Sequence, residues 1–393
     1  MRIIHTCLRY PPATGGVETY VRDIVEGTRD ISVGRDIRVL TSKLRTHGPI
    51  SLLNPELLLD DPMYVQRLHH ASTPFISYPR LQALSYYLGH HAPDVVHGHG
   101  FWYQPADVAA RYANKNRLPF IFHPYYYEHG VRRKAIWQLY RRTIGRRTFA
   151  AADVVVVISP FEQKLIEQAG FPVKRFELVP PGIDVAVFAK PAADPFRPRN
   201  ITGKIVLAVS RLAPGKGLSE LISAIAEIAK QQPQVQLAVV GEDFGVKGKL
   251  EQQAQALGLG DRVHFLGKLS RIELIGAYQH ASLLVHPSHY EAFGIVLTES
   301  LAAGTPVVAR NTAAIPYVVP DQQAGVLFNN QAELVRGIKL LVTDANKCKA
   351  FAEHGRQYVA SRFDSERSLK KITDLYCEMG SLTSHISRSV EAN

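Results

Sequence analysis

Residues His289–Val308 read HYEAFGIVLTESLAAGTPVV and place two glutamates, Glu291 and Glu299, eight positions apart in an apolar setting. An apolar run, Ala281–His286, comes just before this stretch and is typical of a buried strand. Apolar residues then recur at helical spacing until Gly304-Thr305-Pro306, which ends the helix. The stretch therefore predicts a strand, a loop holding Glu291, and a helix with Glu299 in its second turn.

The start of this helix, at Gly294, is a candidate phosphate site. A helix N-terminus offers unpaired N–H groups and a partial positive charge, which suit a phosphate. Glu299 would face the group attached to that phosphate, and Glu291 would approach it from the loop. Both glutamates could instead only stabilise the helix dipole. The functional interpretation predicts a phosphorylated, hydroxyl-rich ligand.

Length and composition indicate a folded protein of two domains. The chain has 393 residues, of which 46% are hydrophobic and 21% charged. Its first residues open directly into a strand, and no apolar run has the length of a spanning helix, so we expect neither a signal peptide nor a membrane span. Three scattered cysteines fit a reducing, cytoplasmic location.

The net charge of +11 concentrates partly in Arg132–Arg147, where basic pairs alternate with apolar and aromatic residues. Such a basic amphipathic helix is typical of peripheral contact with an anionic membrane surface, here the inner face of the membrane, or of an anionic-ligand groove. A solvated helix face that also packs on a core explains the same pattern equally well. We expect no nucleic-acid partner, since no binding motif accompanies the charge.

The N-terminal half begins with a strand, Arg2–Leu8, a turn containing Gly15 and Gly16, and a helix from Val17. Glycines in such a turn let a ligand approach the backbone closely. Two glycines without the three-glycine dinucleotide pattern are a weak signal. Residues 45–70 have no clear period and are expected to be irregular.

Histidines and tyrosines follow two further strands of this half. His97 and His99 end one strand, and His123 ends the next, followed by Tyr125 and Tyr127. Polar groups at the carboxyl ends of parallel strands are candidates for ligand contact, here with a sugar. A metal half-site is less favoured because no third ligand is evident, and tyrosines that pack over a helix are the alternative.

Strands and helices alternate again after a proline-rich stretch to Asn200, which predicts a second parallel, doubly wound domain. Arg211 and Lys216 follow its first strand, five residues apart across a glycine turn. Two such cations could neutralise a diphosphate and assist its departure. Surface salt bridges are the alternative.

Six motifs follow one another from the first strand to about Phe363: Pro11-Pro12 to Glu18, Asp94–His97, Ser159, Pro180–Asp184, Ser210–Leu212 with Lys216-Gly217, and Glu291–Glu299. In this order they resemble the retaining glycosyltransferases of family GT4. The resemblance implies a GT-B fold, an α/β architecture of two facing Rossmann-like domains. It implies an acceptor-binding domain (1–185), a linker (186–200), a nucleotide-sugar-binding domain (201–362), and a final helix with a tail (363–393) that returns to the first domain.

The resemblance also implies roles for individual residues. Arg211 and Lys216 would stabilise the leaving diphosphate, Glu291 would contact sugar hydroxyls, and His123 would stand near the reacting carbon. The family histidine position could instead be held by Tyr125 or Tyr127. The acceptor would meet His97, His99, Tyr125 and Tyr127. The donor would contact Gly15, Gly16, Gly241, Lys268, Leu269, Phe293, Gly294, Ile295, Val296 and Glu299.

The activity implied is metal-independent transfer of a hexosyl group, without a cofactor, from a nucleotide sugar to a glycan or lipid-linked acceptor in cell-surface polysaccharide biosynthesis. UDP-glucose is the first candidate donor, while UDP-GlcNAc, UDP-galactose and GDP-mannose stay open. The acceptor hydroxyl would attack from the leaving-group face, and the departing phosphate would take its proton. The alternatives are a GT-B nucleotide-sugar epimerase and a non-catalytic nucleotide- or sugar-binding module.

Overall fold

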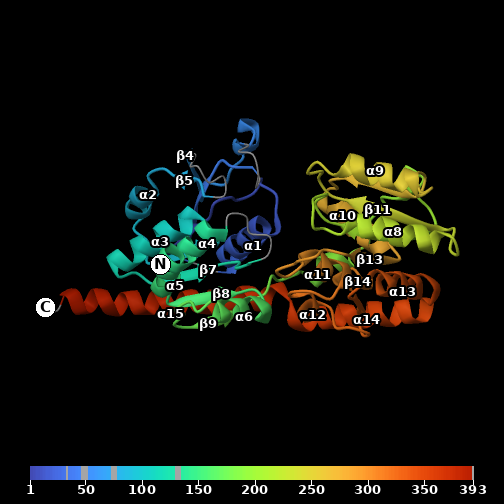
Figure 1. Ribbon diagram of the computed structural model, residues 1–393. Helices are drawn as coiled ribbons and strands as arrows, with labels where there is room; N and C mark the ends of the chain where they lie inside the picture. The colour runs from blue at the N-terminus through green and yellow to red at the C-terminus, as the bar shows by residue number, and fades with distance from the viewer. Residues whose placement is uncertain (32–33, 46–51, 72–77, 129–133, 392–393) are drawn as a thin grey trace. The chain divides into compact units, whose positions relative to one another are not determined.

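The structure, a computed structural model, describes residues 1–31, 34–45, 52–71, 78–128 and 134–391 (Figure 1). The chain forms two compact units. Unit 1 comprises Met1–Pro180 and Arg367–Asn393, and unit 2 comprises Pro181–Glu366. Each unit is a parallel sheet between helices, which confirms the expected α/β architecture of two Rossmann-like domains.

Unit 1 contains a parallel seven-stranded sheet in the order β3-β2-β1-β6-β7-β8-β9. Its strands are β1 (Arg2–Thr6), β2 (Asp36–Ser42), β3 (Val65–Leu68), β6 (Val95–His99), β7 (Phe120–His123), β8 (Val154–Val157) and β9 (Phe176–Leu178); β4 (His70–Ala71) and β5 (Arg80–Leu81) form a separate antiparallel pair. The strand order reverses direction between β1 and β6, where His5 is paired with His97. Ligands of doubly wound sheets collect at the carboxyl edge of such a reversal.

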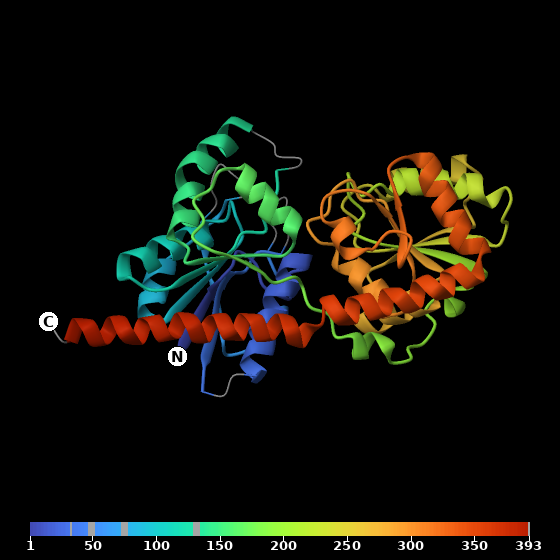
Figure 2. The ribbon, with the colours of Figure 1, turned by 90° about the horizontal axis from the view of Figure 1, so that it is seen from below.

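The helices of unit 1 follow from apolar periodicity and from caps such as Ser159, whose hydroxyl accepts from the N–H of Glu162. They are α1 (Gly16–Ile31), α2 (Leu84–His91), α3 (Gln104–Asn116), α4 (Lys134–Tyr140), a π-helical segment (Arg141–Gly145), α5 (Arg146–Ala151), α6 (Pro160–Gln168) and most of α15 (Ser365–Glu391), with a 3-10 turn at Pro55–Leu58. Figure 2 shows α15 running across the strands of this sheet. The hydroxyl of Tyr376 on α15 reaches both His5 and His97.

Unit 2 contains a parallel six-stranded sheet in the order β12-β11-β10-β13-β14-β15. Its strands are β10 (Lys204–Val209), β11 (Val235–Val240), β12 (Val263–Gly267), β13 (Leu283–His286), β14 (Val307–Arg310) and β15 (Gly325–Phe328). Runs of β-branched residues with both faces buried produce this pattern. The strand order reverses between β10 and β13, so the switch point lies between the two loops that carry Lys216 and Glu291.

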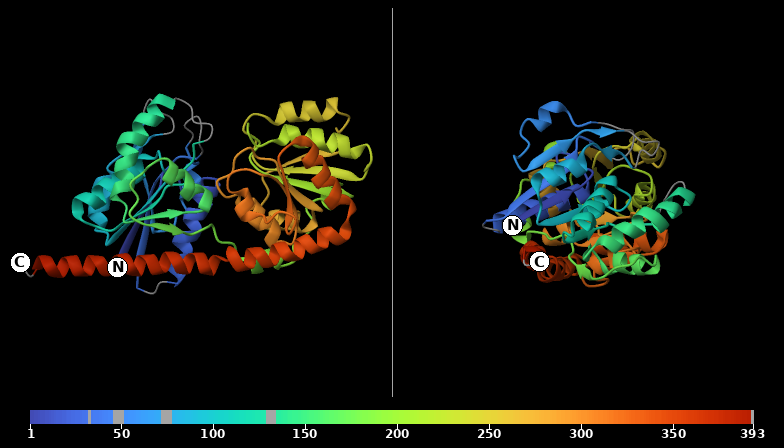
Figure 3. Two further views of the ribbon diagram at one scale, coloured as in Figure 1. Left: turned by 60° about the horizontal axis from the view of Figure 1, so that its bottom comes forward. Right: turned by 90° about the vertical axis from the view of Figure 1, so that its left-hand side faces the viewer.

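Helices cover both faces of the second sheet (Figure 3). They are α7 (Val185–Ala189), α8 (Leu218–Ala229), α9 (Lys247–Ala256), α10 (Arg271–His280), α11 (Ile295–Ala302), α12 (Ile315–Val318), α13 (Gln331–Thr343) and α14 (Ala345–Arg362), with a 3-10 turn at Arg197–Arg199. The apolar sides of α8, α9 and α13 bury one core cluster against the strands. Right-handed crossovers place α10 and α11 on the opposite face.

Two expectations for the chain's irregular parts were wrong. The region 45–70 contains β3, a parallel edge strand paired with β2, where irregular structure was expected. The last part of the chain was expected to be a tail after the final helix, but α15 continues to Glu391. The short strand VQRL has too little hydrophobic pattern to be recognised from sequence, and the polar end of α15 has equally little.

The proline-rich stretch 186–200 packs onto unit 2. Phe188 and Phe196 are buried, and the Gln279 amide donates to the carbonyls of Phe188 and Lys190. The boundaries between the two units fall at Pro180/Pro181 and Glu366/Arg367, near the expected 185 and 362. This stretch is therefore part of a folded unit, where a linker was expected.

The segment 134–151 combines a buried aromatic face with exposed arginines. Trp137, Tyr140 and Phe149 belong to the core of unit 1, whereas Arg142 and Arg147 are exposed. Arg132 and Arg133 lie outside the described residues. The aromatic residues are thus explained by core packing. No described helix has the length and apolarity needed to cross a membrane.

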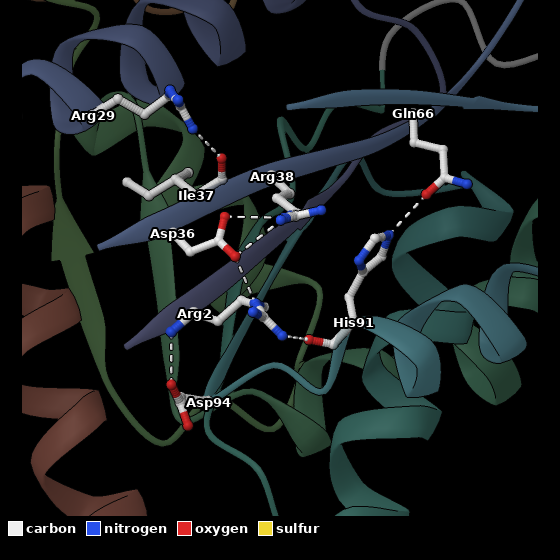
Figure 4. A network of polar contacts seen from close by, with 8 residues as sticks. All are labelled: Arg2, Arg29, Asp36, Ile37, Arg38, Gln66, His91 and Asp94. Atoms are coloured by element: carbon white, nitrogen blue, oxygen red, sulfur yellow. Dashed lines mark hydrogen bonds and ion pairs between the residues drawn. The ribbon is translucent and has the colours of Figure 1, made fainter. Parts of the chain in front are cut away.

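A polar network ties the amino ends of the unit 1 strands together (Figure 4). Arg2 donates to Asp36 at 2.7 Å and, through its N–H, to Asp94 at 2.6 Å. Asp36 also accepts from Arg38 at 2.9 Å. These contacts lie at the edge of the sheet opposite to the strand ends that carry the candidate site residues, so their role is structural.

Candidate active site

The loops after β10 and β13 are packed directly against each other. The N–H of His289 donates to the carbonyl of Gly215 at 2.9 Å. Gly217 has a φ of +70°, and a Cβ there would lie 2.2 Å from the carbonyl oxygen of Pro287. Only glycine permits both this conformation and this approach. The two loops therefore form one surface at the switch point of unit 2.

Lys216, Glu291 and His286 meet on this surface. The Lys216 ammonium lies 3.0 Å from Glu291 Oε2, and His286 Nε2 lies 3.2 Å from the same oxygen. His286 is buried at the end of β13, whereas the side chains of Lys216 and Glu291 keep 20% and 23% of their surface exposed. The ion pair is therefore accessible to a ligand, and the buried His286 fixes the position of Glu291.

Glu291 is an ionised carboxylate throughout the physiological range. Burial opposes its ionisation, but the hydrogen bond from His286 and the charge of Lys216 lower its pKa to about 2. It therefore accepts hydrogen bonds and donates none, which suits it to bind the hydroxyl groups of a ligand.

The helix α11 begins beside this pair. Gly294 has a φ of +89° and precedes the first helical residue, Ile295. The N–H groups of Ile295 and Val296 belong to the first turn, which has no intrahelical partners for them. Phe293 is 2% exposed and packs edge-on against Phe363, so it supports the loop from inside. Of the expected donor contacts here, Phe293 is thus placed in the core.

Glu299 lies on the second turn of α11 and is almost buried. The hydroxyl of Tyr278 donates to its Oε2 at 2.8 Å, and Arg271 lies 3.8 Å from its Oε1. These contacts orient the carboxylate. Burial and the neighbouring Glu299 charge raise the pKa of Tyr278, so that phenol stays protonated as a donor.

The remaining expected donor residues of unit 2 line the strand ends more loosely. Arg211 is exposed, with its guanidinium 5.3 Å from the centre of the Phe244 ring. Gly241 approaches the carbonyl of Ser210 so closely that a Cβ would lie 1.9 Å away. Lys268 is exposed and Leu269 buried after β12. All four follow β10, β11 or β12 at the carboxyl edge.

In unit 1, Gly15 and Gly16 stand where the loop enters α1. A Cβ on Gly15 would lie 2.1 Å from Oε2 of Glu18, which is buried and paired with Arg9 at 2.7 Å. The buried Arg9–Glu18 pair thus packs directly against this glycine turn. Sequence reasoning did not single out either residue as functional.

The histidines of unit 1 are deeply buried. His97 and His123 are fully buried and hydrogen-bonded to each other at 2.7 Å, and His99 is 1% exposed. His123, expected near the reacting carbon, directs both ring nitrogens toward protein partners. Tyr125 keeps 8% of its surface exposed and Tyr127 keeps 44%. Of these five, the two tyrosines keep more exposed surface than the histidines, and Tyr127 keeps the most.

His286 and Ser288 were missed by sequence reasoning. The sequence pattern places His286 at the end of a strand and does not mark Ser288 as functional. In the structure His286 bonds Glu291, and the Ser288 hydroxyl lies 3.5 Å from Lys216 Nζ. A polar residue at the carboxyl end of a strand beside the switch point is the signal that could have identified both.

Two family models match the chain, one on each side of residue 185. Residues 15–182 match the family described as glycosyl transferase 4-like domain, and residues 191–358 match the one described as glycosyl transferases group 1.

Curated relatives match part of the chain. A D-inositol 3-phosphate glycosyltransferase of Corynebacterium jeikeium is 32% identical over 255 residues, which are 61% of this chain and 60% of that protein. A mannosylfructose-phosphate synthase of Agrobacterium fabrum is 34% identical over 173 residues, 41% of this chain and 38% of that protein. The matches thus span 60% or less of these two relatives' lengths.

Solved structures match nearly the whole chain. HepE of Anabaena, in complex with UDP and glucose, superposes with a TM-score of 0.78 at 22% identity, over 96% of this chain and 100% of that one. A sucrose-phosphate synthase of Thermosynechococcus elongatus gives a TM-score of 0.77 at 23% identity, over 97% and 99%. These neighbours confirm the GT-B fold.

Proposed function

The chain belongs to the GT4-type glycosyltransferases of GT-B fold, and from this premise we propose that it transfers a hexosyl group from a nucleotide sugar to a glycan or lipid-linked acceptor. UDP-glucose is the first candidate donor, and cell-surface polysaccharide biosynthesis is the proposed setting. The observation that carries the proposal is the Lys216–Glu291–His286 cluster beside the N-terminus of α11, at the switch point of unit 2.

Each member of this site has a use in the transfer. Lys216, joined by exposed Arg211, neutralises the charge that develops on the departing diphosphate. The N–H groups of Ile295 and Val296 bind a phosphate. Glu291 accepts hydrogen bonds from sugar hydroxyls, and Glu299, oriented by Tyr278, accepts them from the ribose. Protein cations take the charge-neutralising role, so the proposed reaction requires neither metal nor cofactor.

The proposed reaction retains the anomeric configuration. The acceptor hydroxyl attacks the anomeric carbon from the face that the diphosphate leaves, and a departing phosphate oxygen takes the hydroxyl proton. A new C–O bond thus forms as the sugar–phosphate bond breaks. His123 is fully buried, so the residue beside the reacting carbon is proposed to be Tyr125 or Tyr127.

The choice of UDP-glucose draws on a structural neighbour. HepE of Anabaena is described in complex with UDP-glucose, and its fold covers 96% of this chain. The exposed side chains of Arg142, Arg146 and Arg147 support a further proposal of contact with an anionic membrane on the cytoplasmic side.

A panel of nucleotide sugars followed by thermal unfolding tests the donor. A ligand present at about 100 times its dissociation constant stabilises the protein by about 3 kcal/mol, which raises its melting temperature measurably. The selected donor is then incubated with candidate acceptors in EDTA, and the anomeric coupling of the product is read by NMR. Stabilisation by UDP and one UDP-sugar, with a retained product, is expected; stabilisation by none of the nucleotides would refute the proposal.

A further inference from the structure

Seven buried side chains on one face of the unit 1 sheet form a single hydrogen-bonded line. They come from six parts of the fold: His5 on β1, His97 and His99 on β6, His123 on β7, Tyr125 after β7, Tyr20 on α1 and Tyr376 on α15. None of the seven is more than 8% exposed.

The line can be followed atom by atom from Tyr125. Its hydroxyl lies 3.0 Å from His99 Nδ1, and His99 Nε2 lies 2.9 Å from His5 Nδ1. His5 Nε2 lies 3.0 Å from the Tyr376 hydroxyl, which lies 2.9 Å from His97 Nδ1. We call the full line of seven side chains the histidine wire.

The other half of the histidine wire ends on the backbone. His97 Nε2 lies 2.7 Å from His123 Nδ1, and His123 Nε2 lies 3.5 Å from the Tyr20 hydroxyl. Tyr20 donates its hydroxyl hydrogen to the carbonyl of Val179 at 2.8 Å. A backbone carbonyl only accepts a hydrogen bond and cannot transfer a proton further. The wire can therefore fix the direction of its hydrogen bonds but cannot release a proton at this end.

The four imidazoles are neutral. Burial lowers the pKa of each of them, to about 3 for His5 and His123. A neutral imidazole has one N–H donor and one acceptor nitrogen, and each ring here has two partners. The nitrogen that carries the hydrogen on one ring therefore determines which nitrogen carries it on the next ring.

Tyr20 sets the direction. Its single hydrogen goes to Val179, so its oxygen can only accept from His123, whose hydrogen must then stand on Nε2. The 3.5 Å contact is long, but a hydrogen on His123 Nδ1 would leave the lone pairs of His123 Nε2 and of the Tyr20 oxygen facing each other in a buried place. By the same argument, His97 donates to His123 and Tyr376 donates to His97. His5 then donates to Tyr376, and His99 donates to His5. At the far end, Tyr125 must donate to His99.

We infer that the histidine wire is ordered in one direction and commits the Tyr125 hydroxyl hydrogen to His99, so that Tyr125 offers a ligand only a hydrogen-bond-accepting oxygen. Tyr125 follows β7 at the carboxyl edge of the sheet and retains some exposure. Under the proposed function, on which this part rests, it selects a hydroxyl group of the acceptor. Tyr376, at the middle of the wire, is the positioning residue.

A metal ion in the same place fits less well. The ligand atoms of His5, His97 and His99 lie within 4.8 Å of one another. Yet the His5 and His99 rings stack at 11° and those of His97 and His99 at 28°, so their in-plane lone pairs run side by side and do not converge. Metal binding would also break the His5–His99 bond.

Long-range proton–nitrogen NMR on histidine-labelled full-length protein tests the wire without any turnover. The four imidazoles are identified by single His→Gln substitutions. We expect all four as Nε2–H tautomers that do not titrate between pH 5.5 and 8 and do not shift with zinc chloride. Nδ1–H tautomers, protonated rings or zinc-dependent shifts would overturn the inference, while the transferase proposal would stand or fall by its own assay.

Two variants test the direction. In Tyr376→Phe, His5 loses its acceptor, so His5 and His99 should change to Nδ1–H while His97 and His123 keep Nε2–H. In Tyr20→Phe the anchor is lost, and all four should move toward Nδ1–H. Tyr86→Phe, at an exposed tyrosine on α2, is the matched control and should change none. Unchanged tautomers in a folded Tyr20→Phe or Tyr376→Phe protein would contradict the ordered wire.

Discussion

Lys216 and Glu291 form an ion pair at 3.0 Å that joins the loop after β10 to the loop after β13. The pair stands at the reversal of strand order in unit 2, with His286 behind it. Its partial exposure matters, because a diphosphate can then approach Lys216 and a sugar hydroxyl can approach Glu291. The relationship links the fold of unit 2 directly to the proposed chemistry.

Replacing Lys216 by Ala should lower kcat/KM for sugar transfer by about a hundredfold or more, because it removes a charge that stabilises the leaving diphosphate. UDP release from the donor, followed with time, measures the effect. Lys249→Ala, at an exposed lysine on α9, is the matched control and should leave the rate unchanged. Equal rates for the two variants would remove Lys216 from the mechanism.

Replacing Glu299 by Gln should weaken UDP binding about tenfold, because hydrogen bonds to a charged group contribute about 1.5–3 kcal/mol. The amide keeps the volume and can still accept from Tyr278. Isothermal titration with UDP measures the change. Glu227→Gln, at an exposed position on α8, should bind like the wild type; a Glu299→Gln protein with unaltered affinity would place the ribose elsewhere.

Gly217→Ala should destabilise unit 2 more than Gly215→Ala. Both glycines have positive φ, but a Cβ at 217 meets the carbonyl of Pro287 at 2.2 Å, whereas a Cβ at 215 meets nothing within 4 Å. The pair therefore separates the clash from the shared backbone strain. Calorimetric unfolding should show the lower melting temperature for Gly217→Ala, by several degrees. Equal losses would mean that the two loops can move apart without cost.

Unit 1 should lose stability in acid. Burial lowers the pKa of four histidines, so below pH 6.5 the unfolded chain binds protons that the folded unit does not. Each such histidine lowers the free energy of unfolding by about 1.4 kcal/mol for every pH unit below 6.5. Burial raises the pKa of Glu162 to about 7 and of Asp107 to about 6, which offsets part of the loss. The net free energy of unfolding should fall from pH 6.5 to 5.

Tryptophan fluorescence makes this measurement specific. Trp102 and Trp137 are the two tryptophans of the sequence, and both lie in unit 1. Urea unfolding followed by their emission at pH 7, 6 and 5 therefore reports on unit 1. A free energy of unfolding that is constant or higher at pH 5 would show that the histidines take up protons in the folded state.

The sequence predicts the sheets well because their strands are continuous β-branched runs, such as Val154–Val157. It predicts the Lys216 and Glu291 loops because glycines and prolines break the pattern there. It does not predict β3, whose half-polar residues resemble loop sequence. These differences follow from how much apolar surface each segment buries.

The side-chain partners could not be predicted in the same way. Tyr376 and His97 are 279 positions apart and meet only because α15 packs on unit 1. His286 bonds Glu291 only in the geometry of the finished loop. The expectation for His123 rested on its place at a strand end, which does not tell whether the ring faces the ligand or the core. Its burial is the reason why Tyr125 or Tyr127, and not His123, is proposed to stand beside the reacting carbon.

The most direct test of the proposed site is a crystal structure of the protein with UDP. We expect the diphosphate within hydrogen-bonding distance of Lys216 Nζ and of the N–H groups of Ile295 and Val296, with the ribose bound to Glu299. Nucleotide bound away from the carboxyl ends of β10 and β13, or no bound nucleotide at saturating concentration, would contradict it.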